Sequence, residues 1–217
     1  GGVTPDIDDP ENLKSLFNIA QDLLDSSLIS AMHDISDGGL ITSLIEMSLC
    51  SSIGLDIRMD ISSKEKLIPS LFAEEAGLVV EVQNENLAKV KEMLKNSNLS
   101  YADVAKTTDK QAVNIFHFNE TVFSDTLQNL FNAWSDVSYK VQRLRDNIET
   151  AESERKTNQE FQKFLTPDIK FDIPPAQKNL FGKKPKIALL REQGINGHYD
   201  MAAALMAAGF EVHDVHM

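Results

Sequence analysis

The sequence has a single cysteine, Cys50, among its 217 residues, and its lysines and arginines form no basic stripe. One cysteine excludes an internal disulfide bond and is typical of a chain that works in a reducing compartment. Lysine and arginine together number 21, against 33 aspartates and glutamates, which gives a formal net charge of −12. Because nucleic acids and anionic membranes bind basic surfaces, this balance argues against both as partners.

Long apolar runs and a leader segment are also missing from the sequence. No apolar run reaches the roughly 20 residues that span a bilayer, and no charged-then-apolar segment opens the chain. The chain opens on Gly1 and Gly2 instead of methionine, so we expect a segment of a longer polypeptide. These absences favour a soluble, cytoplasmic protein that can still bind phosphorylated small molecules through main-chain amides and a metal ion.

Apolar periodicity predicts helices that alternate with strands as far as Asn147. A helix is expected after Pro10, and Gly54–Ile61 alternates apolar with charged residues, as a strand with one wet face does. Further strands are expected at 29–32, 78–82, 101–105 and 112–118, further helices at 87–94 and 122–133, and a turn at 107–109. This interleaving predicts an α/β layered domain over residues 1–147.

The remainder of the chain changes character twice. Residues 148–185 are first rich in charged and amide side chains and then in proline, which predicts a linker whose first part can form a helix. Residues 186–217 contain an apolar strand pattern, a helix that Gly209 ends, and a second strand, so they predict a βαβ unit. Because two strands and one helix cannot bury both faces of a sheet, we expect the chain to stop inside this second domain.

The most informative stretch runs from His33 to Leu40, where an apolar strand turns into an amphipathic helix. Gly38 and Gly39 fall in the first turn of this helix. Main-chain amides there lack partners within the helix, point outward at the positive end of the helix dipole, and can approach a phosphate closely when the residue is glycine. The pattern therefore predicts a phosphate-binding corner.

Two carboxylates, Asp34 and Asp37, lie in the same corner and would repel a bare phosphate. The phosphate interpretation therefore requires a divalent cation, most plausibly Mg²⁺, between carboxylate and phosphate. The alternative interpretation is structural: Ser36 or Asp37 caps the helix, and the glycines ease a tight turn. A calcium loop of the EF-hand type fits poorly, because Ile45 stands where its bidentate acid belongs.

Several blocks of the sequence resemble the large, glutamine-dependent phosphoribosylformylglycinamidine synthases of purine biosynthesis. The resemblance covers nearly the whole chain and comprises Thr4–Asp6, His33–Leu40 with the following helix and Gly54–Ile57, Leu71–Gly77, Trp134–Tyr139, Gln142–Asn147 and Lys186–Met217. The block after Leu190, with Arg191-Glu192-Gln193-Gly194-Ile195-Asn196-Gly197-His198, resembles the opening of the family's glutaminase domain.

This resemblance implies both a fold and an activity. It implies a C-terminal synthetase domain of the aminoimidazole ribonucleotide synthetase-like type, followed by a truncated flavodoxin-like class I glutaminase unit. The family is an ATP-dependent carbon–nitrogen ligase that converts formylglycinamide ribonucleotide, glutamine and ATP into the amidine, glutamate, ADP and phosphate. Its partners would be the nucleotide, the ribonucleotide substrate and the remaining domains of the same polypeptide.

The resemblance also implies the roles of individual residues. Asp34 would bind Mg²⁺ and Ser36 would contact the phosphates of ATP or ADP, with Gly38 and Gly39 as further nucleotide-binding residues. No catalytic residue is expected within the chain, because the nucleophile turn of the glutaminase would follow residue 217. The resemblance leaves open whether a nucleotide bound at this corner turns over or has a structural role.

Other residues attract attention but carry weaker predictions. Cys50 is expected to be a small core residue, not a nucleophile, because it lies on an apolar helix with no histidine nearby in sequence. His198, His213 and His216 are expected to have surface or supporting roles, because no carboxylate follows at a spacing typical of a metal site. Trp134, Val137, Val141, Leu144 and Ile148 form a heptad-like stripe that is expected to be core.

A rival hypothesis comes from another functional class. The chain could be a non-catalytic module that senses nucleotide and magnesium, fused to an unrelated flavodoxin-like domain. The neighbouring coding sequence separates the two: a glycine-rich turn with cysteine downstream and a substrate-binding half upstream favour the ligase.

Overall fold

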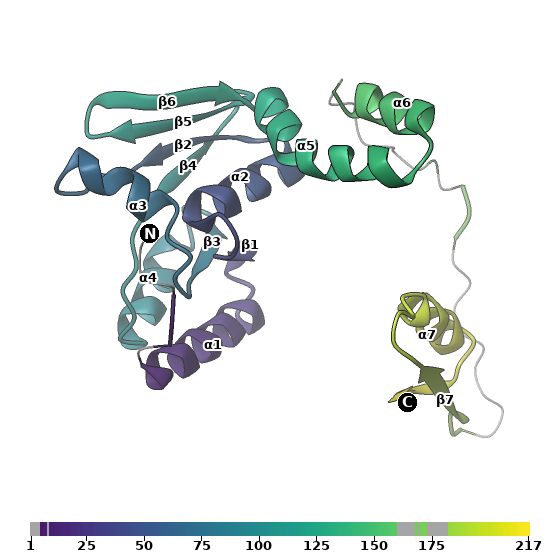
Figure 1. The fold of residues 1–217 in the computed structure, drawn as a ribbon. Helices are drawn as coiled ribbons and strands as arrows, with labels where there is room; N and C mark the ends of the chain where they lie inside the picture. Colours follow the sequence, from purple (N-terminus) through teal and green to yellow (C-terminus); the bar gives the residue numbers. More distant parts are fainter. Residues whose placement is uncertain (1–4, 8, 160–167, 169, 173–181) are drawn as a thin grey trace. The chain divides into compact units, whose positions relative to one another are not determined.

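A computed structural model of the chain describes residues 5–7, 9–159, 168, 170–172 and 182–217. The chain divides into two compact units, residues 1–163 and residues 164–217. Helices and strands interleave through both units (Figure 1), so the predicted α/β class is confirmed.

The first unit contains a four-stranded sheet in the order β4-β2-β5-β6. Its strands are β2 (Gly54–Arg58), β4 (Ala105–Thr108), β5 (Ala112–His117) and β6 (Glu120–Thr126). β2 runs parallel to β5, whereas the β2–β4 and β5–β6 pairs are antiparallel. In β2 Leu55 and Ile57 are buried and Arg58 is exposed, so the predicted strand with one wet face is confirmed.

Helix α2 (Gly39–Ser51) covers the apolar face of this sheet. Its Ile41 and Leu44 pack in one core with Leu55 and Ile57 of β2 and Val113 of β5. A short 3-10 turn, η1 (Lys64–Lys66), and helix α3 (Leu67–Leu71) close the end of this core. The residues of α2 that face the core recur at helical spacing, which is why the sequence pattern identified the helix.

A second, two-stranded sheet pairs β1 (Ile29–Asp34) with β3 (Leu78–Val82) in antiparallel register. Helices α1 (Pro10–Asp25) and α4 (Leu87–Asn96) bury a smaller core with it, made of Ile19, Leu23, Leu28 and Val90. In the pairing Asp34 stands opposite Leu78. β1 ends at Asp34, and a short loop then leads directly to the start of α2 at Gly39.

Three predicted elements between residues 101 and 133 are wrong. The turn expected at 107–109 is one of them, because Thr107 and Thr108 belong to β4. The strand expected at 101–105 lies instead at Ala105–Thr108, because this segment pairs along β2 from Gly54 to Ile57. The helix expected at 122–133 begins only at Leu127. β5 and β6 form a hairpin whose two-residue loop, Phe118-Asn119, has Phe118 at φ 52°, so residues 120–126 extend a sheet.

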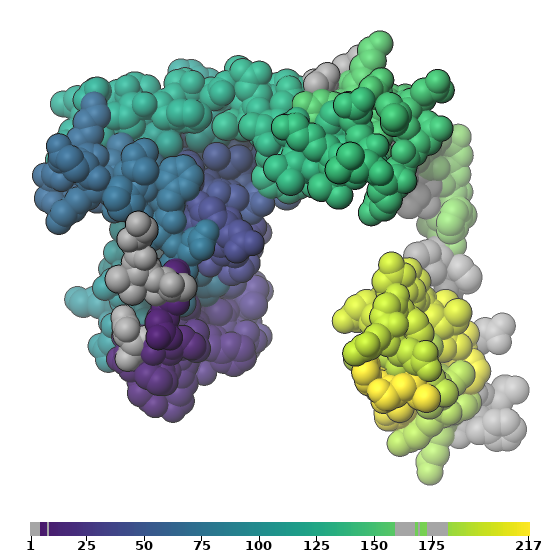
Figure 2. Space-filling model, viewed as in Figure 1, coloured from purple at the N-terminus to yellow at the C-terminus, as the bar shows by residue number. Residues whose placement is uncertain are grey.

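Helix α5 (Leu127–Arg145) follows the hairpin, and α6 (Ile148–Gln159) turns back to pack against it (Figure 1). The contact is polar: Arg155 pairs with Asp136 at 3.0 Å and lies over the Tyr139 ring at 4.2 Å. The hydrogen bond from Lys140 and its charge, with that of Arg155, hold the pKa of Asp136 below its usual value. In Figure 2 the two helices form one packed mass.

The apolar stripe of α5 is not core, so that prediction is wrong. On α5 its members are Trp134, Val137, Val141 and Leu144, and all of them are exposed, Leu144 to 91%. Ile148, the last predicted member, is also exposed, but it begins α6. α6 covers a different, polar side of α5, which leaves the stripe facing outward. The first compact unit includes α6, whereas the division at residues 147 and 185 stays a prediction.

The second unit contains β7 (Lys186–Arg191), α7 (His198–Ala207) and β8 (Glu211–His216). β7 and β8 pair in parallel, so the predicted βαβ unit is confirmed. Arg191 and Asp214 form an ion pair between the two strands at 2.9 Å. Across the described ranges of both units, no helix has the length and apolar character needed to cross a membrane.

We expect Gly54→Ala to destabilise the first unit strongly. A Cβ atom on Gly54 would lie 1.8 Å from the carbonyl oxygen of Lys110 and 2.6 Å from that of Ala112, and main chain cannot move aside cheaply. Overpacking of this kind costs about 1–3 kcal/mol or more. Urea unfolding measures the loss, and Gly197→Ala is the control because no atom lies within 4 Å of its Cβ position. Equal stability of the two variants would contradict this packing.

Candidate functional site

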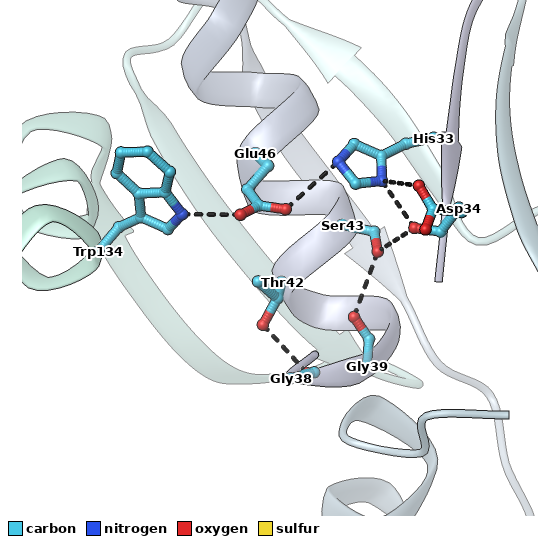
Figure 3. Close-up of polar contacts among 8 residues, drawn as sticks. All are labelled: His33, Asp34, Gly38, Gly39, Thr42, Ser43, Glu46 and Trp134. Carbon is cyan, nitrogen blue, oxygen red and sulfur yellow. Dashed lines mark hydrogen bonds and ion pairs between the residues drawn. The ribbon is translucent and has the colours of Figure 1, made fainter. Parts of the chain in front are cut away.

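The predicted corner lies where β1 ends and α2 begins (Figure 3). The main-chain oxygen of Asp34 accepts a hydrogen bond from Ser43 Oγ at 2.8 Å and lies 2.6 Å from His33 Nδ1. These two contacts hold the main-chain oxygen of Asp34. Its side chain is 74% exposed, so the carboxylate is presented to ligands in solution.

Both glycines of the corner have a structural requirement. Gly38 caps α2 at φ 85° and Gly39 begins the helix at φ 71°, a left-handed backbone region that favours glycine. A Cβ on Gly39 would lie 2.6 Å from the carbonyl carbon of Phe72 and 2.7 Å from the carbonyl oxygen of Ala73. The start of α2 therefore rests directly on the main chain that follows α3.

The amides of the two glycines have partners, and both partners lie outside α2, as expected for amides without partners within the helix. Gly39 N donates to Ser36 O at 2.9 Å, and Gly38 N donates to Glu74 Oε1 at 2.8 Å. The second contact places a carboxylate oxygen on the amide that was expected to meet a phosphate. It shows that the Gly38 amide can donate to an anionic oxygen from outside the helix.

Ser36 and Asp37 do not cap the helix. The cap position is Gly38, and α2 has no side-chain capping hydrogen bond. The structure describes every residue from 9 to 159, so Ser36 and Asp37 are both included in this statement. Both side chains are exposed. The alternative interpretation, in which one of them acts as N-cap, is therefore wrong, and both remain available to a ligand.

A row of polar contacts leads from the corner to α5 (Figure 3). His33 Nε2 lies 3.3 Å from Glu46 Oε2 on α2, and Glu46 Oε1 accepts a hydrogen bond from Trp134 Nε1 at 2.7 Å. Sequence reasoning did not single out His33, Glu46, Trp134 or Glu74 for the site. Glu74 lay in a recognised block, but nothing in the local pattern placed it beside Gly38.

The donor chemistry at Asp34 fits Mg²⁺ as a single ligand. No group of three or more histidine, cysteine, aspartate or glutamate side chains that could hold a metal occurs among the residues that the structure describes. Mg²⁺ usually keeps several waters and binds through one or two carboxylates plus substrate phosphates, not through an all-protein cage. One exposed carboxylate beside a helix start is compatible with that mode.

Cys50 is exposed, so its prediction as a core residue is wrong. The buried face of α2 contains Ile41, Leu44 and Ser48, and position 50 falls outside that face. His213 is also exposed and lies 3.0 Å from Glu211 Oε1 on the same strand.

A groove of about 830 Å³ borders the corner in the first unit, and its lining includes Ile35 and Leu40, the residues on either side of Ser36–Gly39. Leu16 and Leu23 of α1, Leu44 of α2, Val90 of α4 and Tyr101 contribute to its walls. None of the four predicted site residues lines it. The four predicted site residues therefore lie at the margin of this groove and not on its walls.

Residues 2–117, more than half of the chain, match the family described as AIR synthase related protein, C-terminal domain. The chain belongs to this family. Residues 184–217 match a second family, the CobB/CobQ-like glutamine amidotransferase domain. An AIR synthase related domain followed by an amidotransferase segment is the order that the resemblance to phosphoribosylformylglycinamidine synthase implied, and that resemblance is confirmed.

Solved structures of Thermotoga maritima PurL have the fold of this AIR synthase related chain. The complex with ATP aligns with a TM-score of 0.53 at 18% identity, over 60% of this chain and 24% of that one. The complex with ADP gives 0.52 at 19% identity, over 60% and 24%, and the complex with FGAR gives 0.50 at 17% identity, over 54% and 20%. The chain spans about a fifth to a quarter of these PurL chains.

We expect Ser36→Ala and Asp37→Ala each to change the free energy of unfolding by less than about 0.5 kcal/mol, because neither side chain caps α2. Asp9→Ala serves as the control, because the Asp9 side chain accepts a hydrogen bond from Glu11 N at 3.0 Å and caps α1. Loss of such a cap costs about 1 kcal/mol. Urea denaturation measures all three variants. A loss for Ser36→Ala or Asp37→Ala as large as that for Asp9→Ala would restore the capping interpretation.

Proposed function

We propose that the chain is part of a phosphoribosylformylglycinamidine synthase, an ATP-dependent carbon–nitrogen ligase with glutamine as nitrogen donor. The parent enzyme would convert formylglycinamide ribonucleotide, glutamine and ATP into formylglycinamidine ribonucleotide, glutamate, ADP and phosphate, in the cytoplasm. The order of the two family matches supports this proposal. PurL structures named for ATP, ADP and FGAR among the relatives in fold support the substrate classes.

Within this function we assign nucleotide binding to the corner between β1 and α2. Asp34 binds Mg²⁺, Ser36 contacts the phosphates, and Gly38 and Gly39 complete the nucleotide side of the site. The observation that carries the assignment is the Asp34 carboxylate, which is 74% exposed while Ser43 and His33 hold its main chain. A carboxylate on a fixed backbone is a suitable ligand for a cation that bridges to phosphate.

The residues of the corner have distinct tasks in this proposal. Bound Mg²⁺ neutralises phosphate charge, which lets an acidic corner accept an anion. A phosphate oxygen takes the place of the Glu74 carboxylate on the Gly38 amide, where an anionic oxygen already fits. The exposed Ser36 hydroxyl lies on the loop between Asp34 and the helix start and donates to the same phosphates.

We assign no catalytic residue to this chain. Cys50 lies on α2 of the first unit, whereas the amidotransferase match covers residues 184–217, so Cys50 is not the glutaminase nucleophile. The nucleophile belongs to a part of the amidotransferase domain outside these residues. The segment here supplies β7, α7 and β8 as a scaffold for that domain.

We expect Asp34→Asn to weaken the binding of MgADP by about tenfold, because the variant keeps the shape of the side chain and loses the charge that a hard cation requires. Ligand at 100 times its Kd raises the free energy of unfolding by about 2.7 kcal/mol, and a tenfold weaker complex loses roughly half of that. Thermal melts with and without MgADP measure the difference. The exposed Asp109→Asn variant is the control. Equal nucleotide-induced shifts in wild type and Asp34→Asn would remove the metal assignment.

We expect Glu74→Gln to strengthen the binding of MgADP by about two- to fivefold. The variant removes a negative charge that occupies the Gly38 amide, and exposed charge interactions of this kind are worth at most about 1 kcal/mol. Isothermal titration measures the dissociation constant. Glu75→Gln is the matched control, because Glu75 is the exposed neighbour and does not contact Gly38. Weaker binding in Glu74→Gln would show that Glu74 assists the ligand and does not compete with it.

A further inference from the structure

Four side chains link the proposed metal ligand to a helix from a distant part of the sequence (Figure 3). Trp134 Nε1 on α5 donates to Glu46 Oε1 at 2.7 Å, and Glu46 Oε2 on α2 lies 3.3 Å from His33 Nε2 on β1. His33 Nδ1 lies 2.6 Å from the main-chain oxygen of Asp34 and 3.5 Å from its carboxylate oxygen Oδ1. Each side chain contacts the next one in the row.

The two middle members are well placed to transmit position. The Glu46 side chain is 25% exposed and that of His33 is 28% exposed, so neighbouring atoms restrict both. Glu46 uses one carboxylate oxygen for Trp134 and the other for His33, which fixes the plane of the carboxylate. Each nitrogen of the His33 ring lies beside an oxygen atom, Nδ1 beside the main-chain oxygen of Asp34 and Nε2 beside Glu46 Oε2. Turning the ring would separate these pairs, so they favour one orientation of His33 against Asp34.

Trp134 stands out from the rest of the α5 stripe. The other members of the stripe on α5, Val137, Val141 and Leu144, are aliphatic, whereas Trp134 has one polar atom and directs it at Glu46. A phenylalanine would supply equivalent apolar surface without that contact. The hydrogen bond therefore gives α5 a polar connection to α2 in addition to packing.

We propose that Trp134, Glu46 and His33 act as positioning residues that orient Asp34 for the metal and couple it to the position of α5. The proposal rests on the proposed nucleotide site. Ser43 and His33 both contact the main-chain oxygen of Asp34, and His33 alone of these two also lies near the carboxylate, with Nδ1 3.5 Å from Oδ1. Residues that orient a metal ligand change metal affinity by about 10- to 100-fold when they are removed.

Glu46→Ala breaks both contacts of the row, whereas Glu46→Gln keeps an acceptor for Trp134 and a polar partner for His33. We expect Glu46→Ala to raise the dissociation constant of MgADP by about tenfold and Glu46→Gln to restore most of the affinity. Glu92→Ala on α4 is the matched control, an exposed helical glutamate away from the corner. Isothermal titration supplies the constants.

A spectroscopic readout separates positioning from mere stabilisation. Trp134 is the only tryptophan of the chain, so its indole N–H gives one resonance in a proton–nitrogen correlation spectrum. Titration with MgADP is expected to shift this resonance with the same dissociation constant as the amides of Asp34 and Ser36. In Glu46→Ala the indole resonance should no longer respond at saturating MgADP.

The outcomes distinguish the relay, which is the row formed by Trp134, Glu46 and His33, from the nucleotide site on which it depends. If the amide resonances of the wild-type chain do not shift with MgADP, the nucleotide site is overturned, and the relay with it. Shifts at Asp34 and Ser36 without any shift of the indole overturn the relay alone. So does an unchanged dissociation constant in Glu46→Ala. Coincident titration of indole and corner, lost in Glu46→Ala and recovered in Glu46→Gln, supports it.

Discussion

The corner of the first unit depends on how closely α2 approaches the main chain after α3. With no side chain on Gly39, the first turn of the helix rests on Phe72 and Ala73, and a single methyl group would separate them. That contact brings Glu74 to the Gly38 amide and sets where the helix begins relative to β1. Ser43, one turn further along α2, then reaches back to the main chain of Asp34. The presentation of the carboxylate follows from a backbone contact.

The proposed nucleotide site has to bind an anion in an acidic corner. Asp34 is exposed and free to meet a cation, while the Gly38 amide already holds an anionic oxygen from Glu74. A metal ion bound to phosphate would place its positive charge beside the Asp34 carboxylate and a phosphate oxygen beside the Gly38 amide. In the proposed assignment the corner would therefore bind a neutralised ligand, and a bare phosphate or a bare cation would meet only one of these two groups.

Local pattern was enough for the elements that bury one face against a neighbour close in sequence. β2, α2 and the βαβ unit show this, because each alternates or repeats at the period of its own structure. Local pattern did not predict β6 of the β5–β6 hairpin, because Val122 and Phe123 suit a helix or a strand and only the pairing with β5 decides between them. Apolar spacing identified α5 as amphipathic, but spacing carries no information on what covers a stripe. The role of Glu74 at Gly38 was not predicted, because a contact between residues 36 positions apart leaves no local sequence pattern.

The exposure of Trp134 has a consequence for the strength of its hydrogen bond. The side chain is 53% exposed, so water competes with Glu46 for the indole N–H, and the bond lies in a medium of high dielectric constant. Any surface that covered the α5 stripe would exclude this water. The same bond in drier surroundings is electrostatically stronger, and breaking it would leave an unpaired polar atom. The strength of the hydrogen bond between Trp134 and Glu46 thus depends on how much water reaches the apolar α5 stripe, even when the geometry of the bond does not change.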